Sequence, residues 1–294
     1  KGELNGLSND YFKKGGINNA LNYKDGRIEG DAYYYYVTGA LHYHVVFKEG
    51  KLDGDFSEYY DDGALAGKYF FKAGEKTGNS IEYYRSGAKL SEGNYKEGLL
   101  NGLFSTFFKN GKTKTEGEYL EGVKINTSKE YYRSGKPSLV ETYDDNGKQN
   151  GLYTDYSRDG KPSLELTFNK GELTAYRVFD ENGKVINENK KKGGKFLFEN
   201  YYLNGTQKIH GLYQVGNGGK DGLWTFYYPN GIIRTEENYN NGFLEGASKN
   251  YYKNGALKRL SFYKKDNSDS IYINYTIDSK ISNQGWYTND KANG

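Results

Sequence analysis

Aromatic residues and glycines recur at fixed intervals along almost the whole chain, with charged and small polar residues between them. A motif that opens with Gly6 returns at Gly30, Gly54, Gly78 and Gly102, a spacing of 24 residues. With small slips it starts again at Asn126, Gly151, Thr174, Phe196, Gly222 and Gly246, which gives eleven units. Self-similarity at such a period indicates a repeat protein in which each unit is one small structural element.

Three aromatic positions and one turn position define the unit. The first aromatic stands five residues after the start of every unit, a second follows directly in nine units, and a glycine stands nine residues after the start. A third aromatic lies eight residues after that glycine in ten of the eleven units, and a second glycine turn commonly follows it. Asn or Asp often precedes the first turn glycine, as in Asn110-Gly111. Because both residues of such a pair tolerate positive φ, the pair predicts a hairpin turn.

The unit therefore predicts one β-hairpin. Tyr and Phe suit a pleated, half-buried surface, and a glycine roughly every eleven residues penalises a helix. A lone hairpin is marginal in water, so successive hairpins are expected to pair edge to edge and share an aromatic stripe. We predict an all-β protein with essentially no helix: an elongated, twisted open sheet or solenoid of about eleven 24-residue hairpin repeats. The first and third aromatics are the expected core, and the second is expected on the opposite face.

Irregular stretches divide the array. Residues 1–183 are expected to form N-terminal hairpin repeats, and residues 196–269 a C-terminal set. Between them, residues 184–195 include three consecutive lysines and two glycines and are expected to form an irregular joint. Residues 270–294, where the pattern stops, are expected to be a capping strand and a tail, because an array needs an atypical end to cover its exposed edge.

The composition removes several classes of protein. The 41 Lys and Arg residues against 38 Asp and Glu give a net charge of only +3, so no nucleic-acid partner is expected. No run approaches 18 apolar residues, so no transmembrane segment is expected. The absence of Cys excludes thiolate nucleophiles and thiolate metal sites. The aromatic fraction of 17% argues against disorder, since aromatic rings can supply the core.

Few residues suggest catalysis or metal binding. His42 and His44 stand two apart on a predicted strand and so face the same side, but a metal site needs a third ligand that the sequence does not offer. The carboxylate pairs Asp61-Asp62, Asp144-Asp145 and Glu236-Glu237 would need a shared cleft for glycosidase chemistry, and two of them fall in turns, where Asp is common. We expect no enzyme activity, no metal and no cofactor.

The row of second aromatics is the remaining candidate site. One interpretation is structural, because cross-strand aromatic pairs stabilise sheets by themselves. The other is a binding face for a protein or a glycan, since Tyr and Arg are enriched at interface hot spots. The residues of this predicted aromatic face are Tyr36, Tyr60, Tyr84, Phe108, Tyr132, Tyr202, Tyr228 and Tyr252.

The unit resembles the bacterial variant of the MORN repeat. The resemblance is carried by Gly222-Leu223-Trp224-Thr225-Phe226-Tyr227-Tyr228-Pro229-Asn230-Gly231 and by the matching segment 102–112. In that family the repeats form β-hairpin arrays used for binding, and the motif contains no catalytic residues. Some bacterial members look like antitoxins, and others are exported or envelope-associated.

The sequence thus predicts a non-catalytic protein that binds another macromolecule. Our first expectation is an exported or cell-envelope protein of a bacterium, located outside the cell or in the envelope, because the chain opens at Lys1 without Met and lacks Cys. The alternative is a cytoplasmic antitoxin or immunity-type protein that neutralises a partner toxin. The oligomeric state stays open.

Overall fold

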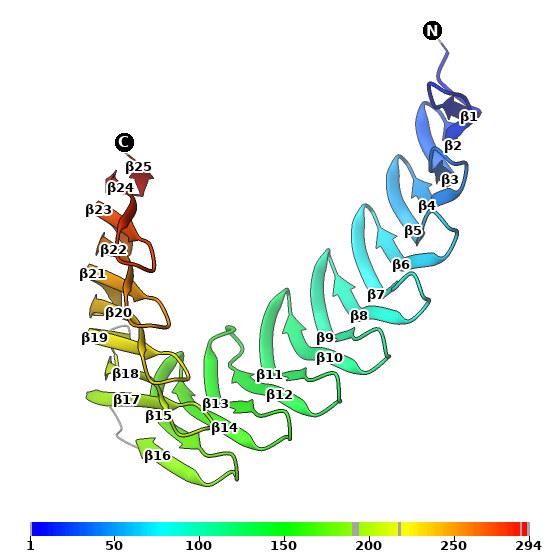
Figure 1. The fold of residues 1–294 in the computed structure, drawn as a ribbon. Helices are drawn as coiled ribbons and strands as arrows, with labels where there is room; N and C mark the ends of the chain where they lie inside the picture. Colours follow the sequence, from blue (N-terminus) through cyan, green and yellow to red (C-terminus); the bar gives the residue numbers. More distant parts are fainter. Residues whose placement is uncertain (1, 190–193, 217–218, 289, 293–294) are drawn as a thin grey trace. The chain divides into compact units, whose positions relative to one another are not determined.

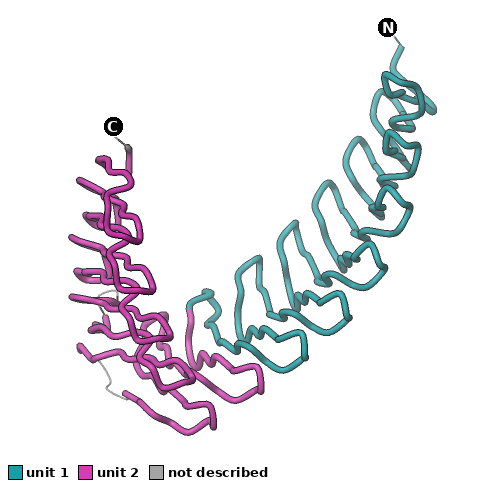
Figure 2. Tube along the Cα trace, in the orientation of Figure 1, with its two compact units in different colours: residues 1–148 teal, residues 149–294 magenta. Residues whose placement is uncertain are grey.

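The computed structural model describes residues 2–189, 194–216, 219–288 and 290–292. Within these ranges the chain is all-β, with no helix, as predicted (Figure 1). Among the described residues we therefore find no helix long and apolar enough to cross a membrane. The chain forms two compact units, residues 1–148 and residues 149–294 (Figure 2).

Unit 1 is a succession of hairpins in which each strand pairs antiparallel with the next strand of the chain. Its strands are β1 (Gly6–Tyr11), β2 (Ile17–Lys24), β3 (Arg27–Tyr35), β4 (Leu41–Lys48), β5 (Lys51–Tyr59), β6 (Leu65–Lys72), β7 (Glu75–Tyr83), β8 (Lys89–Lys96), β9 (Leu99–Phe107), β10 (Thr113–Leu120), β11 (Val123–Tyr131) and β12 (Pro137–Tyr143).

Unit 2 contains strands of two sheets, because the hydrogen-bonded ladder stops after β16 and a nine-stranded sheet begins at β17. Its strands are β13 (Gln149–Tyr156), β14 (Pro162–Asn169), β15 (Glu172–Phe179), β16 (Val185–Asn189), β17 (Lys195–Tyr201), β18 (Gln207–Gln214), β19 (Gly219–Tyr227), β20 (Ile233–Asn240), β21 (Phe243–Tyr251), β22 (Leu257–Lys264), β23 (Asn267–Tyr275), β24 (Ile281–Thr288) and β25 (Lys291–Ala292). Of the expected joint, residues 190–193 lie outside the described residues. Its flanks belong to β16 and β17.

The first turn of each hairpin differs from the predicted Asx-Gly turn. In the hairpin of β3 and β4, Gly39 donates its N–H to the carbonyl of Tyr36, and the N–H of Tyr36 bonds to the carbonyl of Ala40, both at 2.8 Å. Only the glycine has positive φ, +87° at Gly39, as in a four-residue turn followed by a glycine bulge. The preceding Asn instead caps the turn with its side chain. At Asn110, for example, Oδ1 accepts the N–H of Lys112 at 3.2 Å.

The second turn is the two-residue turn with two positive φ angles. Asp25 and Gly26 have φ of 49° and 75°, which matches the type I′ turn that the strand twist favours. These turns also join successive repeats. The N–H of Gly50 bonds to the carbonyl of Ile28 at 3.0 Å, and the N–H of Glu49 bonds to the carboxylate of Glu29 at 2.7 Å.

The glycine that opens most units lies in an irregularity of the β ladder. Leu21 pairs with Ala32 and Tyr23 with Ile28, so the intervening residues around Gly30 form a bulge in which Gly30 has φ of +77°. Asn126 and Ser270 adopt the same kind of backbone, with φ of 54° and 70°. Ser270 opens a twelfth hairpin, β23 and β24, so the segment 270–294 continues the repeat beyond the single strand expected there.

The aromatic positions lie on opposite faces of the sheet, which corrects the predicted core. Side chains alternate along a strand, and the register places the third aromatic Phe47 opposite Gly30 and Leu52. Tyr35, the first aromatic, is an odd number of residues from Gly30 and so faces the other way. In unit 1 the core therefore consists of third aromatics with residues such as Ala32 and Val45. In unit 2 the prediction holds in part, because the first aromatic Phe179 is buried and Tyr201 packs against the core cluster.

Candidate functional site

The predicted aromatic face lies at one edge of the repeat, just beyond the strand that ends in the first aromatic. We call this margin, formed by the first turns, the first-turn edge. All eight predicted side chains are partly buried there. Six of their hydroxyls donate at 2.8 to 2.9 Å to the carbonyl of the first aromatic of the following hairpin, so this row connects successive repeats. The donors are Tyr36, Tyr60, Tyr84, Tyr202, Tyr228 and Tyr252.

Cations from neighbouring turns cover several of these rings. In unit 1 the guanidinium of Arg85 stands 4.7 Å from the ring centroid of Tyr60, and that of Arg133 stands 6.0 Å from Phe108. In unit 2 the ammonium of Lys258 stands 5.6 Å from the ring of Tyr252. Such contacts contribute about 0.5–1 kcal/mol at exposed sites. They therefore favour a position of the cation above the ring.

One hollow on the first-turn edge of unit 1 combines rings and cations. It encloses about 450 Å³ and is lined by Tyr84, Phe108, Lys109, Asn110, Lys114 and Arg133. In the described part of the chain, no carboxylate forms an ion pair with Lys109, Lys114 or Arg133. The hollow therefore offers positive charge to a ligand beside two aromatic rings.

A second hollow of the same kind lies in unit 2. It encloses about 570 Å³, and its lining includes Tyr228 with Arg234, Lys258 and Arg259. Within the residues that the structure describes, these three cations form no ion pair either. Lys114, Arg234 and Lys258 each stand twelve residues after the start of their unit, so the two hollows share this cation position and the second aromatic, while the rest of their linings differ.

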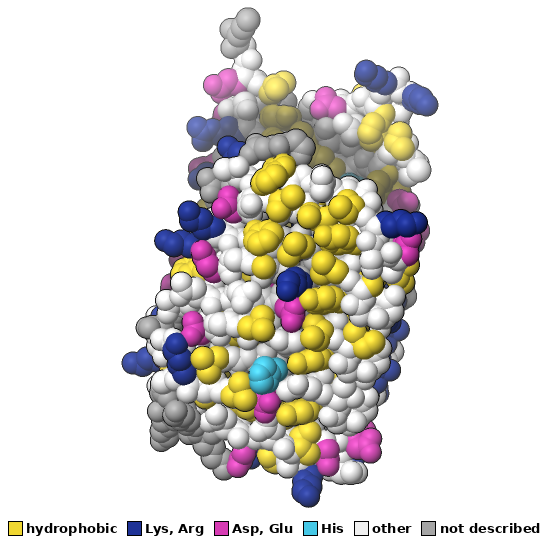
Figure 3. Space-filling view, turned by 60° about the vertical axis from the view of Figure 1, so that its left-hand side comes forward, with side chains coloured by type: hydrophobic (Ala, Val, Ile, Leu, Met, Phe, Trp, Pro, Cys, Tyr) yellow, Lys and Arg dark blue, Asp and Glu magenta, His cyan; other side chains and the backbone are white. Residues whose placement is uncertain are grey.

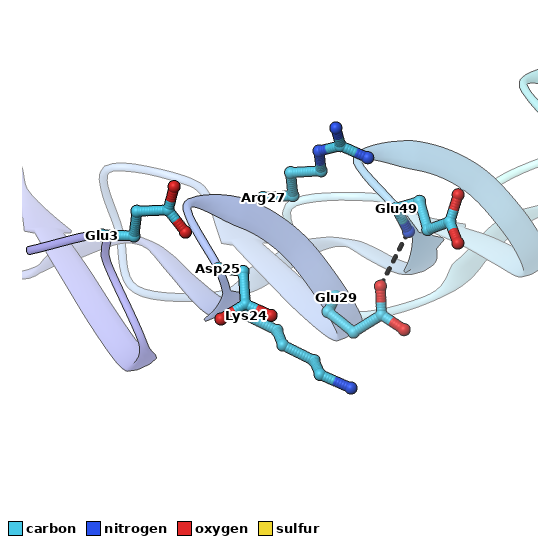
Figure 4. Close-up of a pocket in the computed structure, with 6 residues that line it drawn as sticks. All are labelled: Glu3, Lys24, Asp25, Arg27, Glu29 and Glu49. Atoms are coloured by element: carbon cyan, nitrogen blue, oxygen red, sulfur yellow. Dashed lines mark hydrogen bonds between the residues drawn. The ribbon is translucent and has the colours of Figure 1, made fainter.

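The opposite edge of unit 1 carries a different charge pattern. A hollow of about 420 Å³ near the second turns is lined by Glu3, Lys24, Asp25, Arg27, Glu29 and Glu49, that is, by four carboxylates and two cations (Figure 4). The Glu29 carboxylate is turned toward the N–H of Glu49, which it accepts. Glu29 thus caps a second turn, and Asp25 and Glu49 belong to such turns, so this edge is better explained by the fold.

Lysines among the aromatics of the sheet face were missed by sequence reasoning. The ammonium of Lys76 stands 4.3 Å from the ring of Tyr69 and 4.0 Å from that of Tyr95, and Lys220 is similarly placed among Trp224, Phe226 and Tyr239. Burial lowers the pKa of both lysines. The signal was a Lys at the position where other units have Leu. Figure 3 shows one side of the molecule, on which hydrophobic side chains form a band that a few charged side chains interrupt.

The other candidate residues have ordinary structural partners. The His44 ring stacks on Tyr33 with centroids 4.7 Å apart, and its Nε2 lies 2.7 Å from an Asp31 carboxylate oxygen. Asp61 and Asp62 bind Arg85, and Asp144 caps its own turn. Among the described residues, no group of three or more His, Asp or Glu is placed to hold a metal ion.

Comparison with known proteins agrees with the hairpin geometry. Residues 52–73, 76–97, 100–121, 220–241 and 244–265 match the family model of the MORN repeat variant. These five hairpins are thus similar to MORN repeats of the variant type. Three of the matched hairpins lie in unit 1 and two in unit 2, and the two cation-lined hollows are built largely from them.

Solved structures and curated proteins add little. The chain aligns over 95% of its length with 17% of a chain in the Tc holotoxin pore of Photorhabdus luminescens, at 10% identity and a TM-score of 0.19. It aligns with 16% of a chain in a TcdB2–TccC3–Cdc42 complex, at 13% identity and a TM-score of 0.16. The chain thus spans about a sixth of the chains it matches, and the likeness is too weak to support a function. A search of curated proteins finds no match.

Proposed function

We propose that this repeat protein is non-catalytic and binds a protein partner along its first-turn edge. The observation that carries the proposal is the presence, in each unit, of a hollow in which cations without an ion-pair partner among the described residues stand beside aromatic rings. Rings and Arg side chains are enriched at the points of an interface that contribute most to affinity. A strand array supplies them at regular intervals on a rigid support.

Location and biological role are part of the same proposal. We propose that the protein is exported or associated with the envelope of a bacterium, where a Cys-free repeat array would bind its partner in an oxidising compartment. Neutralisation of a toxin is the alternative role, and it would use the same edge. The two roles differ in the partner, which can be identified by experiment.

The test is capture of a partner by the intact chain, followed by a binding measurement with that partner in purified form. A variant with Tyr84→Ser, Phe108→Ser and Tyr132→Ser should weaken binding by at least tenfold, because it removes three rings of the edge. Since Tyr84 also joins repeats, a variant with Tyr84→Phe alone serves as the control: it removes the hydroxyl and keeps the ring.

A partner whose affinity is unchanged in the triple variant would show that binding lies elsewhere. Far-UV circular dichroism and the urea midpoint of each variant check that the repeat array remains folded.

A further inference from the structure

The first-turn edge is not uniform in charge, and its most basic part covers three consecutive turns of unit 1. The turn segments 84–90, 108–114 and 132–136 contain seven Lys and Arg residues and no Asp or Glu. We call these seven side chains the basic strip: Arg85, Lys89, Lys109, Lys112, Lys114, Arg133 and Lys136. The preceding turn carries Asp61 and Asp62 instead, so the strip has a defined end.

Internal ion pairs engage only part of the strip. Arg85 binds both Asp61 and Asp62, and Lys89 binds Glu92. Lys109, Lys114 and Arg133 have no carboxylate partner among the described residues, and these three line the hollow with Tyr84 and Phe108. The positive charge is therefore concentrated at the same place as the exposed parts of the rings.

The spacing between successive turns of the strip indicates which kind of partner segment would fit it. Successive hairpins advance by two strands, which is roughly 10 Å at about 4.8 Å per strand. An extended polyproline II segment has three residues per turn and rises about 3.1 Å per residue, so every third side chain points the same way at intervals of about 9.3 Å. Acidic residues at every third position of such a segment would meet one turn of the strip after another.

The rings between the cations suit the same kind of segment. Grooves lined by aromatic side chains are the usual docking surface for proline-rich extended segments, which pay little entropy on binding. The planar guanidinium of Arg133 can hold a carboxylate with two parallel hydrogen bonds. Nucleic acid is disfavoured because the net charge of the whole chain is only +3 and the opposite edge is rich in carboxylates.

We propose that the basic strip binds an acidic, extended protein segment whose carboxylates recur at every third residue. This inference rests on the proposed function and specifies the chemistry of the partner. The cations of the strip attract the carboxylates of the segment and fix which acid meets which turn. The rings of Tyr84 and Phe108 contact the apolar residues between the acids.

The experiment uses the full chain and a fluorescently labelled peptide of five Glu-Pro-Pro triplets, with binding followed by fluorescence anisotropy. A peptide of the same composition with its five Glu residues placed together is the matched ligand. The strip variant carries Lys109→Gln, Lys114→Gln and Arg133→Gln. The matched control carries Lys24→Gln, Lys48→Gln and Lys72→Gln, which removes the same charge from exposed positions at the second-turn edge of the same unit.

We expect the triplet peptide to bind the unaltered chain at least fivefold more tightly than the clustered peptide. The strip variant should lose roughly tenfold or more in affinity and the control variant less than twofold, and raising the salt concentration should weaken binding.

Three results would overturn the inference. The first two are equal affinity of the chain for both peptides and an equal loss of peptide affinity in the strip variant and the control variant. The third is strip-dependent binding of phosphatidylserine vesicles or of a single-stranded oligonucleotide that is tighter than binding of the peptide. Failure here is distinguishable from failure of the proposed function. A captured partner that depends on the rings of the first-turn edge but is not displaced by the triplet peptide would leave the proposed function standing.

Discussion

The two units bury their aromatic residues to different extents. In unit 1 the cluster of buried apolar residues consists of Leu21, Ala32 and Val45, and the larger rings around them, such as Phe56, are only partly buried. In unit 2, Tyr176 and Val178 on β15 pack against Phe196, Phe198 and Trp224 on the strands β17 and β19 of the second sheet, and all five are buried.

The difference shows what a second layer contributes. A single sheet can cover a small side chain with its neighbours on the same face, but a ring stands above that face and stays accessible. In unit 2 the second layer closes over the rings: Tyr176 lies 4.9 Å from the ring of Phe198 and donates its hydroxyl to the carbonyl of Leu197 at 3.0 Å. We therefore expect the aromatic residues of unit 2 to contribute more to stability than those of unit 1.

Truncation of one ring in each unit should give the largest difference. Trp224→Ala is expected to lower the free energy of unfolding by about 3–5 kcal/mol, because the indole is 4% exposed and its removal leaves a cavity. Phe56→Ala should cost about 1–2 kcal/mol, since Phe56 is partly exposed and loses less burial. Urea unfolding followed by circular dichroism measures both. Equal costs would show that the second layer adds nothing to the burial of rings.

The sequence predicted the repeat and its strands because the pattern is local. Each turn glycine and each aromatic position constrains only its own hairpin, so the period of 24 residues was sufficient to predict both. The packing of β15 against β17 was not predictable, because it joins two sheets and the residue pattern within one hairpin does not show whether a second sheet covers its face. Ser270 was missed because a serine took the positive φ that glycine adopts in most other units.

A glycine in each unit provides a sharper test at the level of single atoms. A Cβ added at Gly211 would lie 2.3 Å from the nearest atom of the Trp224 indole, whereas one at Gly117 meets nothing closer than 3.5 Å. Neither glycine has positive φ. Gly211→Ala should therefore destabilise unit 2 by roughly 1–3 kcal/mol through overpacking, and Gly117→Ala should be neutral within about 0.5 kcal/mol or slightly stabilising.

Thermal and urea unfolding of these two variants, with Trp fluorescence as a local probe, separate the effects. If Gly211→Ala leaves the free energy of unfolding unchanged, the Trp224 indole can move away from the sheet. The packing around this side chain in unit 2 would then be looser than the structure indicates.

The row of second aromatics could be found from its phase in the repeat, but its chemistry could not. The structure places these residues at the first-turn edge within each unit, and their role as a binding face stays a prediction. Their alternative structural role was also foreseen, but the bonds from their hydroxyls to the next repeat were not, because a residue 23 to 25 positions away is the acceptor. The hollows also depend on cations at a fixed position of the unit, such as Lys114 and Lys258, which carried no signal of their own.

A pair of repeat-equivalent tyrosines tests whether the units also share interactions on the other sheet face. Tyr131 in unit 1 donates to the carboxylate of Glu116 at 2.7 Å, and Tyr251 in unit 2 donates to Glu236 at 2.6 Å. Because this face is partly exposed in both cases, we expect Tyr131→Phe and Tyr251→Phe each to cost only about 1 kcal/mol at neutral pH. Urea midpoints of both variants check the equality.

The pH dependence of stability tests whether the cost of Tyr131→Phe comes from the hydrogen bond to Glu116. Burial and the bond to Glu116 raise the pKa of Tyr131 to about 12, so its contribution is fully present below the pKa near 10 of an unfolded tyrosine and is lost as the pH rises through 12. The hydrogen bond from Tyr131 and, to a smaller extent, the ammonium of Lys129 lower the pKa of Glu116. The stability that the Glu116 carboxylate contributes is therefore present above about pH 4.3 and is lost as the pH falls through its lowered pKa. The stability difference between the unaltered chain and Tyr131→Phe should therefore be constant from about pH 6 to 9 and shrink at both ends. A difference that does not change with pH would show that the phenol contributes by packing alone.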